Sequence, residues 1–222
     1  MPYRFTPLVT RQFYHIFNRG IARQPVFLDK YDYQRMIDTL WFYHFAESSV
    51  KFSRYLTLPY KQKTSLINTL ALSKDIVSIN THALMPNHFH LLLSQEKDGG
   101  ISKFIKKVID SYTRFFNTKY ERNGAIFQGQ FKAKLIESDE QLLHLSRYIH
   151  LNPYTSHIVN RLEDIINYPW SSMSEYMNIR EGISNPKYIL SNFGSKEKYL
   201  EFVNDQKNYQ RILGDIKHLT FE

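Results

Sequence analysis

Two histidines separated by one residue, His88 and His90, are the side chains of this sequence that best suit metal chemistry. They lie in the run NHFHLLLS, whose β-forming and apolar residues favour a strand. Alternate side chains of a strand share a face, so the two imidazoles project together while Phe89 points to the other face, into the core. Such a pair can chelate one metal ion. Buried histidines of an ordinary strand give the same pattern, so a metal site also requires a third ligand and a group that acts on substrate.

The segment YIHLNP supplies the next candidates, Tyr148 and Asn152. Residues four apart on a helix lie on one face, about one turn from each other. A phenol can attack phosphorus, and an amide oxygen one turn away can complete the ligand shell of a hard cation. Taken alone, the same two residues also fit a half-buried helix tyrosine and a C-terminal cap before Pro153.

Basic residues form a third set of candidates, suited to binding nucleic acid. The chain carries 29 Lys and Arg against 21 Asp and Glu, a net charge of +8, together with 16 Tyr and 16 Phe. Cations at phosphates and aromatic faces at bases are how single strands are bound, although solvated helix faces and core rings give the same composition. The candidate DNA-binding residues are Asn18, Arg19, Arg23, Lys103, Lys107, Arg114, Lys132 and Lys134.

Length and composition exclude several classes of protein. The 222 residues suit one domain, and 42% hydrophobic residues can build a core, so wholesale disorder is excluded. The absence of cysteine excludes disulfides, thiol catalysis and cysteine-bound zinc or iron–sulfur clusters. No apolar run approaches the roughly 18 to 20 residues of a membrane span, and the N-terminal segment lacks the apolar core of a signal peptide. We therefore expect a cytoplasmic protein with no membrane partner.

The elements that position these residues follow from periodicity, caps and turns. Val77 to Met85 and His88 to Ser94 read as two antiparallel strands joined at Pro86-Asn87. Ser138 and Gln141 form a capping box that starts a helix, which we expect to end at Pro153. The other predicted elements are a strand at 12–17, a turn at Gly20, a helix at 29–45 capped by Asp29, a short helix at 61–72, an amphipathic helix with a basic side at 101–122, and a short strand that includes Lys132 and Lys134.

This order of strands and helices predicts an α+β fold. An antiparallel sheet with its helices segregated to one side, of the ferredoxin-like or RRM-like type, is the natural architecture. Within it, residues 47–76 read as a peripheral insertion, and residues 177–222 as a C-terminal extension packed on the same domain.

Five ordered blocks of the sequence resemble the single-tyrosine HUH transposases, whose metal-binding motif is His-hydrophobic-His, and especially the REP-associated tyrosine transposases. The blocks are YHIFNRGIARQPVF at 14–27, ALMPNHFHLLLS at 83–94, GISKFIKKVIDSYTRFFNTKYERNGAIFQGQFKAKLI at 100–136, YIHLNP at 148–153 and YPWSSMSEY at 168–176. The resemblance therefore implies one transposase domain at 1–176, with 47–76 longer than expected of compact members and 177–222 without a matching block.

The resemblance implies a metal-dependent endonuclease and strand transferase that acts on single-stranded DNA, often at hairpins of palindromic repeats. His88 and His90 match the metal-binding pair, Tyr148 the nucleophile, and Asn152 the residue that contributes to the metal site. Mg²⁺ or Mn²⁺ would be the cofactor, and a 5′-phosphotyrosine the intermediate. Association with the nucleoid follows from DNA as partner. A monomer and a homodimer, in which the tyrosine of one chain meets the histidines of the other, both remain open.

Two other functions compete with this interpretation. A domesticated protein could bind single strands or hairpins without cutting them, as RRM-like sheets bind RNA. A metal-dependent hydrolase could use water as its nucleophile. Only the transposase chemistry leaves a covalent bond between protein and DNA, so that adduct separates the three.

Overall fold

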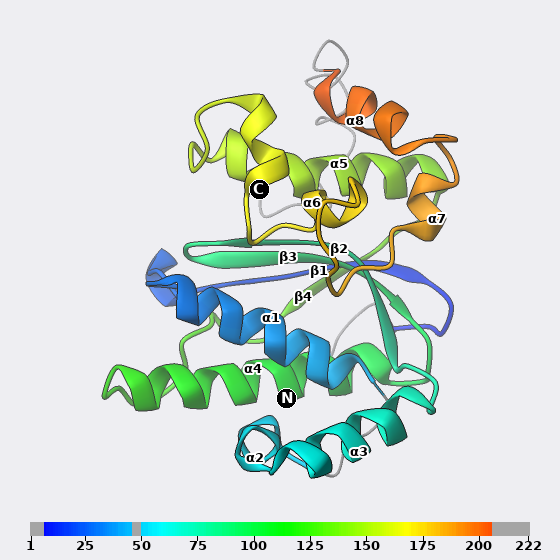
Figure 1. Ribbon diagram of the computed structural model, residues 1–222. Helices are drawn as coiled ribbons and strands as arrows, with labels where there is room; N and C mark the ends of the chain where they lie inside the picture. The colour runs from blue at the N-terminus through cyan, green and yellow to red at the C-terminus, as the bar shows by residue number, and fades with distance from the viewer. Residues whose placement is uncertain (1–6, 46–49, 206–222) are drawn as a thin grey trace.

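The computed structural model describes residues 7–45 and 50–205, and it contains a four-stranded antiparallel sheet (Figure 1). The strands are β1 (Phe13–Arg19), β2 (Val77–Met85), β3 (His88–Gln95) and β4 (Lys132–Leu135), in the order β2-β3-β1-β4. One helix, α1 (Lys30–His44), follows β1, and another, α4 (Gly100–Lys119), follows β3. The α+β class and the ferredoxin-like order are therefore confirmed.

The hairpin of β2 and β3 forms where the sequence predicts it. Strands β2 and β3 turn at Pro86 and Asn87, with Met85 opposite His88. Strand β1 pairs with β3 along one side and with β4 along the other. Strand β4 is therefore an edge strand of the sheet.

Helices cover both faces of the sheet, and the expectation that they lie on one side is wrong. Helices α1 and α4 pack on one face, whereas α5 (Asp139–Thr155) packs on the other (Figure 1). The cause lies in the strands, since all residues of β3 except His88 are buried, on both faces. A strand of this kind needs cover on each side, because exposing either apolar face would cost the free energy of its burial.

Helix α1 begins as predicted at Asp29, whose side chain accepts hydrogen bonds from the backbone N–H groups of Tyr31 and Asp32. The Asp32 carboxylate in turn accepts from the N–H groups of Leu28 and Asp29. Lys119 lies 2.8 Å from the Asp29 carboxylate and 2.7 Å from that of Asp32, and so ties the end of α4 to the start of α1.

Helix α5 continues through Pro153 to Thr155, so the prediction that it ends at the proline is wrong. The missing N–H of a proline removes only one bond of the helix ladder, and close to the last turn that loss is small. The next bonds still form, as between the N–H of Ser156 and the carbonyl of Asn152 at 3.0 Å. Ser138 is the N-cap, as predicted, and accepts from the N–H of Gln141 at 3.2 Å.

The segment at 47–76 contains two helices, α2 (Phe52–Thr57) and α3 (Tyr60–Ala71), of which only the second is predicted from the sequence. Each contributes one fully buried residue, Phe52 and Leu70, to the core beneath α1 and α4. Most of the remaining side chains of the segment are exposed or half-buried, and residues 46–49 lie outside the described ranges.

The segment after α5 forms short helices that pack on α5 and build a second core on that side of the sheet. Ile189, Tyr199 and Val203 are fully buried in it. The elements are η2 (Leu162–Asn167), α6 (Met173–Tyr176), α7 (Lys187–Leu190) and α8 (Lys196–Asn204). Of the predicted extension at 177–222, residues 206–222 lie outside the described part. Within that part, no helix has both the length and the apolar character to cross a membrane.

Candidate active site

Strand register brings His88 and His90 to the sheet face that α5 covers. In antiparallel pairs, residues opposite each other point to the same face. Arg19 lies opposite His88, and Phe17 lies opposite His90, so all four side chains share that face. Tyr148 reaches the same place from α5, with its ring edge-on to His90 at 5.6 Å between centroids. The predicted histidine pair and the predicted tyrosine therefore meet in one site.

Both histidines of the pair are oriented through their Nδ1 atoms. His88 Nδ1 donates to Asn87 Oδ1 at 2.6 Å, because the amide oxygen can only accept, and Asn87 Nδ2 donates to the carbonyl of Arg23 at 2.9 Å. His90 Nδ1 lies 2.8 Å from His15 Nε2, a hydrogen bond in which either ring can be the donor. With Nδ1 as donor, each imidazole of the pair carries its lone pair on Nε2, as a metal ligand requires.

His15 is a member of the site that the sequence analysis does not identify. It is fully buried on β1, and its ring stacks on His90 at 5.0 Å and lies 6.3 Å from Tyr148. The available signal is alternation along β1, since His15, Phe17 and Arg19 fall on one face. To place His15 beside His90, however, the register between β1 and β3 must be known, and the alternation of residues within one strand does not give it.

Burial keeps the two candidate ligands neutral. It lowers the pKa of His88 to about 4, with a further contribution from the Arg19 charge. Burial likewise places the pKa of His90 well below its ordinary value, helped by His15, His88 and Arg19. Neutral imidazole is the form that coordinates a metal, so the site is in its binding state near pH 7.

Cations line the same face as the histidine pair. Lys132 and Lys134 on β4 lie opposite Phe17 and His15, and both lysines are exposed at the sheet edge. Lys132 Nζ is 5.9 Å from the Phe17 ring. Burial and the charge of Arg23 lower the pKa of Arg19, while its proximity to Tyr148 acts in the opposite direction. This combination of a tyrosine, imidazoles and cations can hold a phosphate group.

The remaining candidate DNA-binding residues do not all belong to this site. Arg23 is exposed beside Asn87. Asn18 is 3% exposed and lies opposite the core residue Phe89, so it points to the other face, and its Oδ1 accepts from the N–H of Arg19. Lys103, Lys107 and Arg114 lie on α4, across the sheet from the histidines. The predicted set is therefore split between two sides of the protein.

Asn152 lies one turn after Tyr148 and is largely buried. Its Nδ2 donates to the backbone carbonyl of Tyr148 at 2.9 Å. Within residues 7–45 and 50–205, no group of three or more His, Cys, Asp and Glu has the spacing of a metal site. The structure brings together two neutral imidazoles, His88 and His90. Imidazole nitrogens bind hard cations such as Mg²⁺ or Mn²⁺ only weakly, so an ion of this kind would keep positions open for phosphate oxygens.

Buried hydrogen bonds hold α5 in its place over the site. His150, on the side of α5 away from Tyr148, bonds Tyr199 Oη at 2.7 Å and Ser172 Oγ at 2.8 Å. Arg147 donates to the carbonyls of Phe202 and Asp205 at 2.9 and 3.2 Å. The C-terminal segment therefore fixes the helix that carries the candidate nucleophile. His82 on β2 is fully buried and bonds Ser184 Oγ at 3.0 Å.

These buried histidines predict that stability falls in mild acid. Burial lowers the pKa of His150 to about 3 and also lowers that of His82, from an ordinary value of 6.5. The unfolded chain therefore takes up these protons first, so stability is full above about pH 6.5 and is lost as the pH falls below it, by about 1.4 kcal/mol per pH unit for each histidine.

Urea unfolding at a series of pH values measures this slope. In a His150→Gln variant the slope between pH 6 and pH 4 should be shallower by about 1.4 kcal/mol per pH unit, one proton. A variant with the wild-type slope would show that His150 does not contribute.

Comparison with known sequences identifies the family. Residues 9–152 match the family model described as Transposase IS200 like, which covers well over half of the chain. The chain belongs to this family. No curated protein matches it in sequence.

Two solved structures are similar to this chain. A REP-associated tyrosine transposase bound to a REP hairpin has 15% sequence identity to this chain and a TM-score of 0.50, with 80% of this chain and 86% of the other covered. A transposase candidate from Deinococcus radiodurans also has 15% identity, with a TM-score of 0.36 over 67% of this chain and 95% of the other. At this identity the first structure shows a shared fold.

Proposed function

We propose that this transposase cleaves and rejoins single-stranded DNA at hairpin or palindromic elements, with Tyr148 as the nucleophile and a divalent metal as cofactor. The observation that carries the proposal is the position of Tyr148, whose ring lies edge-on to buried His90 of the pair His88 and His90, on a face lined by cations. A hairpin substrate is suggested by the similar transposase, which was solved with a REP hairpin.

In the proposed step, Tyr148 Oη attacks the scissile phosphorus and loses its proton. The new phosphorus–oxygen bond replaces the bond to the 3′ oxygen, which leaves as a free 3′-OH after taking up a proton. The phosphotyrosine keeps a phosphodiester, so rejoining needs no external energy source. Arg19 and the lysines of β4 would hold the flanking phosphates while the strand is cut.

Mg²⁺ or Mn²⁺ held by His88 and His90, with Asn152 as a third ligand, would polarise the scissile phosphate and stabilise its developing charge. The chain prepares this site by keeping both imidazoles neutral and fixing their Nδ1 atoms through Asn87 and His15. Because Tyr148 lies beside the histidines of its own chain, we propose that one chain holds a complete site and that a monomer suffices.

The test is covalent capture of DNA. The full chain is incubated with Mn²⁺ and a labelled hairpin oligonucleotide that carries single-stranded flanks, and the protein is then separated under denaturing conditions. Label that stays with the protein supports the proposal. Cleavage without label would indicate a hydrolase that uses water, and binding without cleavage would indicate a protein that only binds DNA.

Phosphate contacts should make DNA binding strongly dependent on salt. For about five engaged phosphates, the slope of log K against log salt would be near −3 to −4, at about −0.7 per contact on single strands. Replacing Lys132 and Lys134 together with alanine should make the slope shallower by about 1.4. Fluorescence anisotropy at several salt concentrations measures it.

The matched control is Lys61→Ala with Lys63→Ala, which removes the same charge from α3, away from the site. It should keep the wild-type slope. A wild-type affinity that does not change with salt would show that phosphate contacts do not dominate binding.

A further inference from the structure

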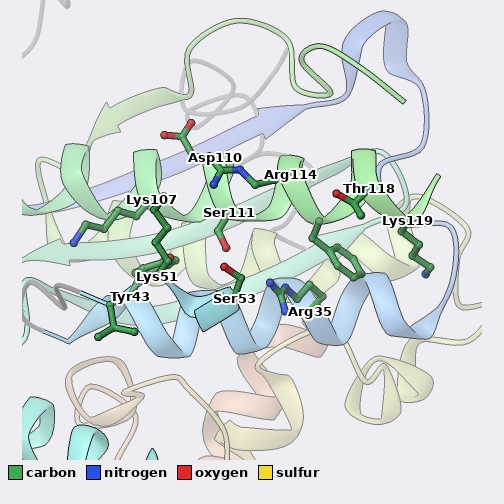
Figure 2. A pocket seen from close by; sticks show the side chains of 12 residues that line it. Arg35, Tyr43, Lys51, Ser53, Lys107, Asp110, Ser111, Arg114, Thr118 and Lys119 are labelled. Carbon is green, nitrogen blue, oxygen red and sulfur yellow. The ribbon is translucent and has the colours of Figure 1, made fainter. Parts of the chain in front are cut away.

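A concentration of positive charge outside the site lines a cavity on the other side of the sheet. The cavity has a volume of about 610 Å³ and lies between α1, α4 and the start of α2 (Figure 2). Its lining includes Arg35, Lys51, Lys107, Arg114 and Lys119 but one carboxylate, Asp110. Such a volume falls within the roughly 300 to 1,000 Å³ of small-ligand pockets.

Ion pairs account for only part of this charge. Lys119 is paired with Asp29 and Asp32, and Asp110 is paired at 2.7 Å with Lys106, which does not line the cavity. Among the described residues, Arg35, Lys51 and Arg114 of the lining lie outside these ion pairs and contribute to its positive charge. Serine hydroxyls of Ser53 and Ser111 stand between them (Figure 2). This lining suits an anion with several acceptor oxygens.

Arg35 is held in the wall of the cavity in a fixed orientation. Its guanidinium carbon lies 4.5 Å from the centre of the Phe52 ring and 5.0 Å from that of Phe115. Its Nε is buried and has no hydrogen-bond partner among the residues that the structure describes. Phe115 and Tyr43 add aromatic surface to the same lining. Cations beside aromatic rings are the combination that binds the phosphate and base of one nucleotide.

A second cavity adjoins this pocket on the α4 side. It has a volume of about 680 Å³, shares Asp110, Arg114 and Thr118 with the first, and extends to Arg122 and the loop at 123–129. That loop bonds the end of β1, through the N–H of Gln128 to the carbonyl of Arg19 at 2.7 Å, and leads into β4. The second cavity thus ends at the loop that leads to the edge strand with Lys132 and Lys134, while the first reaches α1 and the start of α2.

We propose that these joined cavities bind the phosphate backbone of the same single strand, beyond the segment held at the active site. The strand would pass over the β4 edge and place a nucleotide in the pocket of Arg35, Lys51 and Arg114. This inference rests on the proposed function, and it assigns the insertion at 47–76 a role, because Lys51 and Ser53 complete the pocket.

Binding of oligo(dT) of two lengths tests the inference, since backbone contacts do not depend on sequence. Domains that bind single strands typically cover ~4–16 nucleotides. We therefore expect the short oligomer, of about 8 nucleotides, to fill the active-site face, and the long one, of about 20, to reach the cavities as well. The full chain with Lys51→Ala and Arg114→Ala, both exposed residues, should bind the long oligomer about tenfold more weakly, with a salt slope shallower by about 1.4, and the short one unchanged.

The control variant, Lys61→Ala with Lys63→Ala, removes equal charge from α3 outside both cavities. It should stay within about twofold of wild type for both lengths, as surface charges outside a contact do. Equal losses of affinity for the two oligomers, or no loss for either, would overturn the inference. It would also be overturned if dTMP competed with the long oligomer and bound with the same affinity. The covalent adduct is measured separately. If the adduct forms but the variant shows no effect of oligomer length, only the inference that the cavities bind DNA is refuted. A length effect without adduct refutes the proposed cleavage alone.

Discussion

Replacing Tyr148 with phenylalanine is expected to abolish the covalent protein–DNA adduct. The substitution keeps the ring beside His90 and removes only the oxygen that would bond phosphorus. Loss of a nucleophile costs at least about 10³-fold in rate, so the adduct should fall below detection. Tyr148 is only half-buried, so folding should survive, and DNA binding should stay within a few-fold. Denaturing gels of labelled DNA measure the adduct.

Tyr154→Phe is the matched control, because this half-buried tyrosine lies on the same helix α5. It should form the adduct at the wild-type level. If Tyr148→Phe still forms an adduct and peptide mapping places it on another tyrosine, the nucleophile is wrongly assigned even though the family stands.

Local pattern was sufficient to predict the parts of the site that lie within one element. The alternation around His88 and His90 fixes their shared face, and the spacing of Tyr148 and Asn152 fixes theirs. The tight turn at Pro86-Asn87 fixes the hairpin, because its loop is too short to permit another pairing. These features depend only on neighbours in the chain, which is why they agree with the structure.

Features that depend on which elements meet could not be derived in this way. Asn18 and Arg19 are adjacent in sequence, yet only Arg19 faces the site, because the register with β3 decides the face of each. His15 contacts His90 for the same reason. The basic residues of α4 lie across the sheet because the helix packs opposite α5, and amphipathic periodicity shows that a helix has a buried side without showing which face of a sheet it covers.

The sequence of β3 nevertheless indicates that this strand is buried. The run Leu91, Leu92, Leu93 is apolar at consecutive positions, which is typical of a strand covered on both faces. That run contradicts a sheet with helices on one side only, and α5 supplies the cover on the second face. The C-terminal segment that packs on α5 has few sequence signals of its own, since its helices α6 and α7 span four residues each.

Loss of the histidine pair is the other change with a large expected effect. Replacing His88 with alanine removes one of the two imidazole ligands while the bond between His90 and His15 stays in place, so the fold should remain intact. Removing an outer-shell partner typically costs ~10–100-fold in metal affinity or activity, and loss of a direct ligand should exceed that, to about 10³-fold or more. Calorimetric titration with Mn²⁺ measures binding without reference to activity, and cleavage of a labelled hairpin measures the consequence.

A histidine outside the sheet provides the control for this substitution. His157 is exposed after the end of α5, and His157→Ala should keep both Mn²⁺ binding and cleavage. Binding of hairpin DNA should stay within a few-fold in His88→Ala, because Arg19, Lys132 and Lys134 still supply the phosphate contacts that dominate affinity. Full cleavage by a chain that lacks both His88 and His90, in buffer free of metal, would show that phosphoryl transfer at Tyr148 proceeds without the ion, and the metal-dependent mechanism would then have to be abandoned.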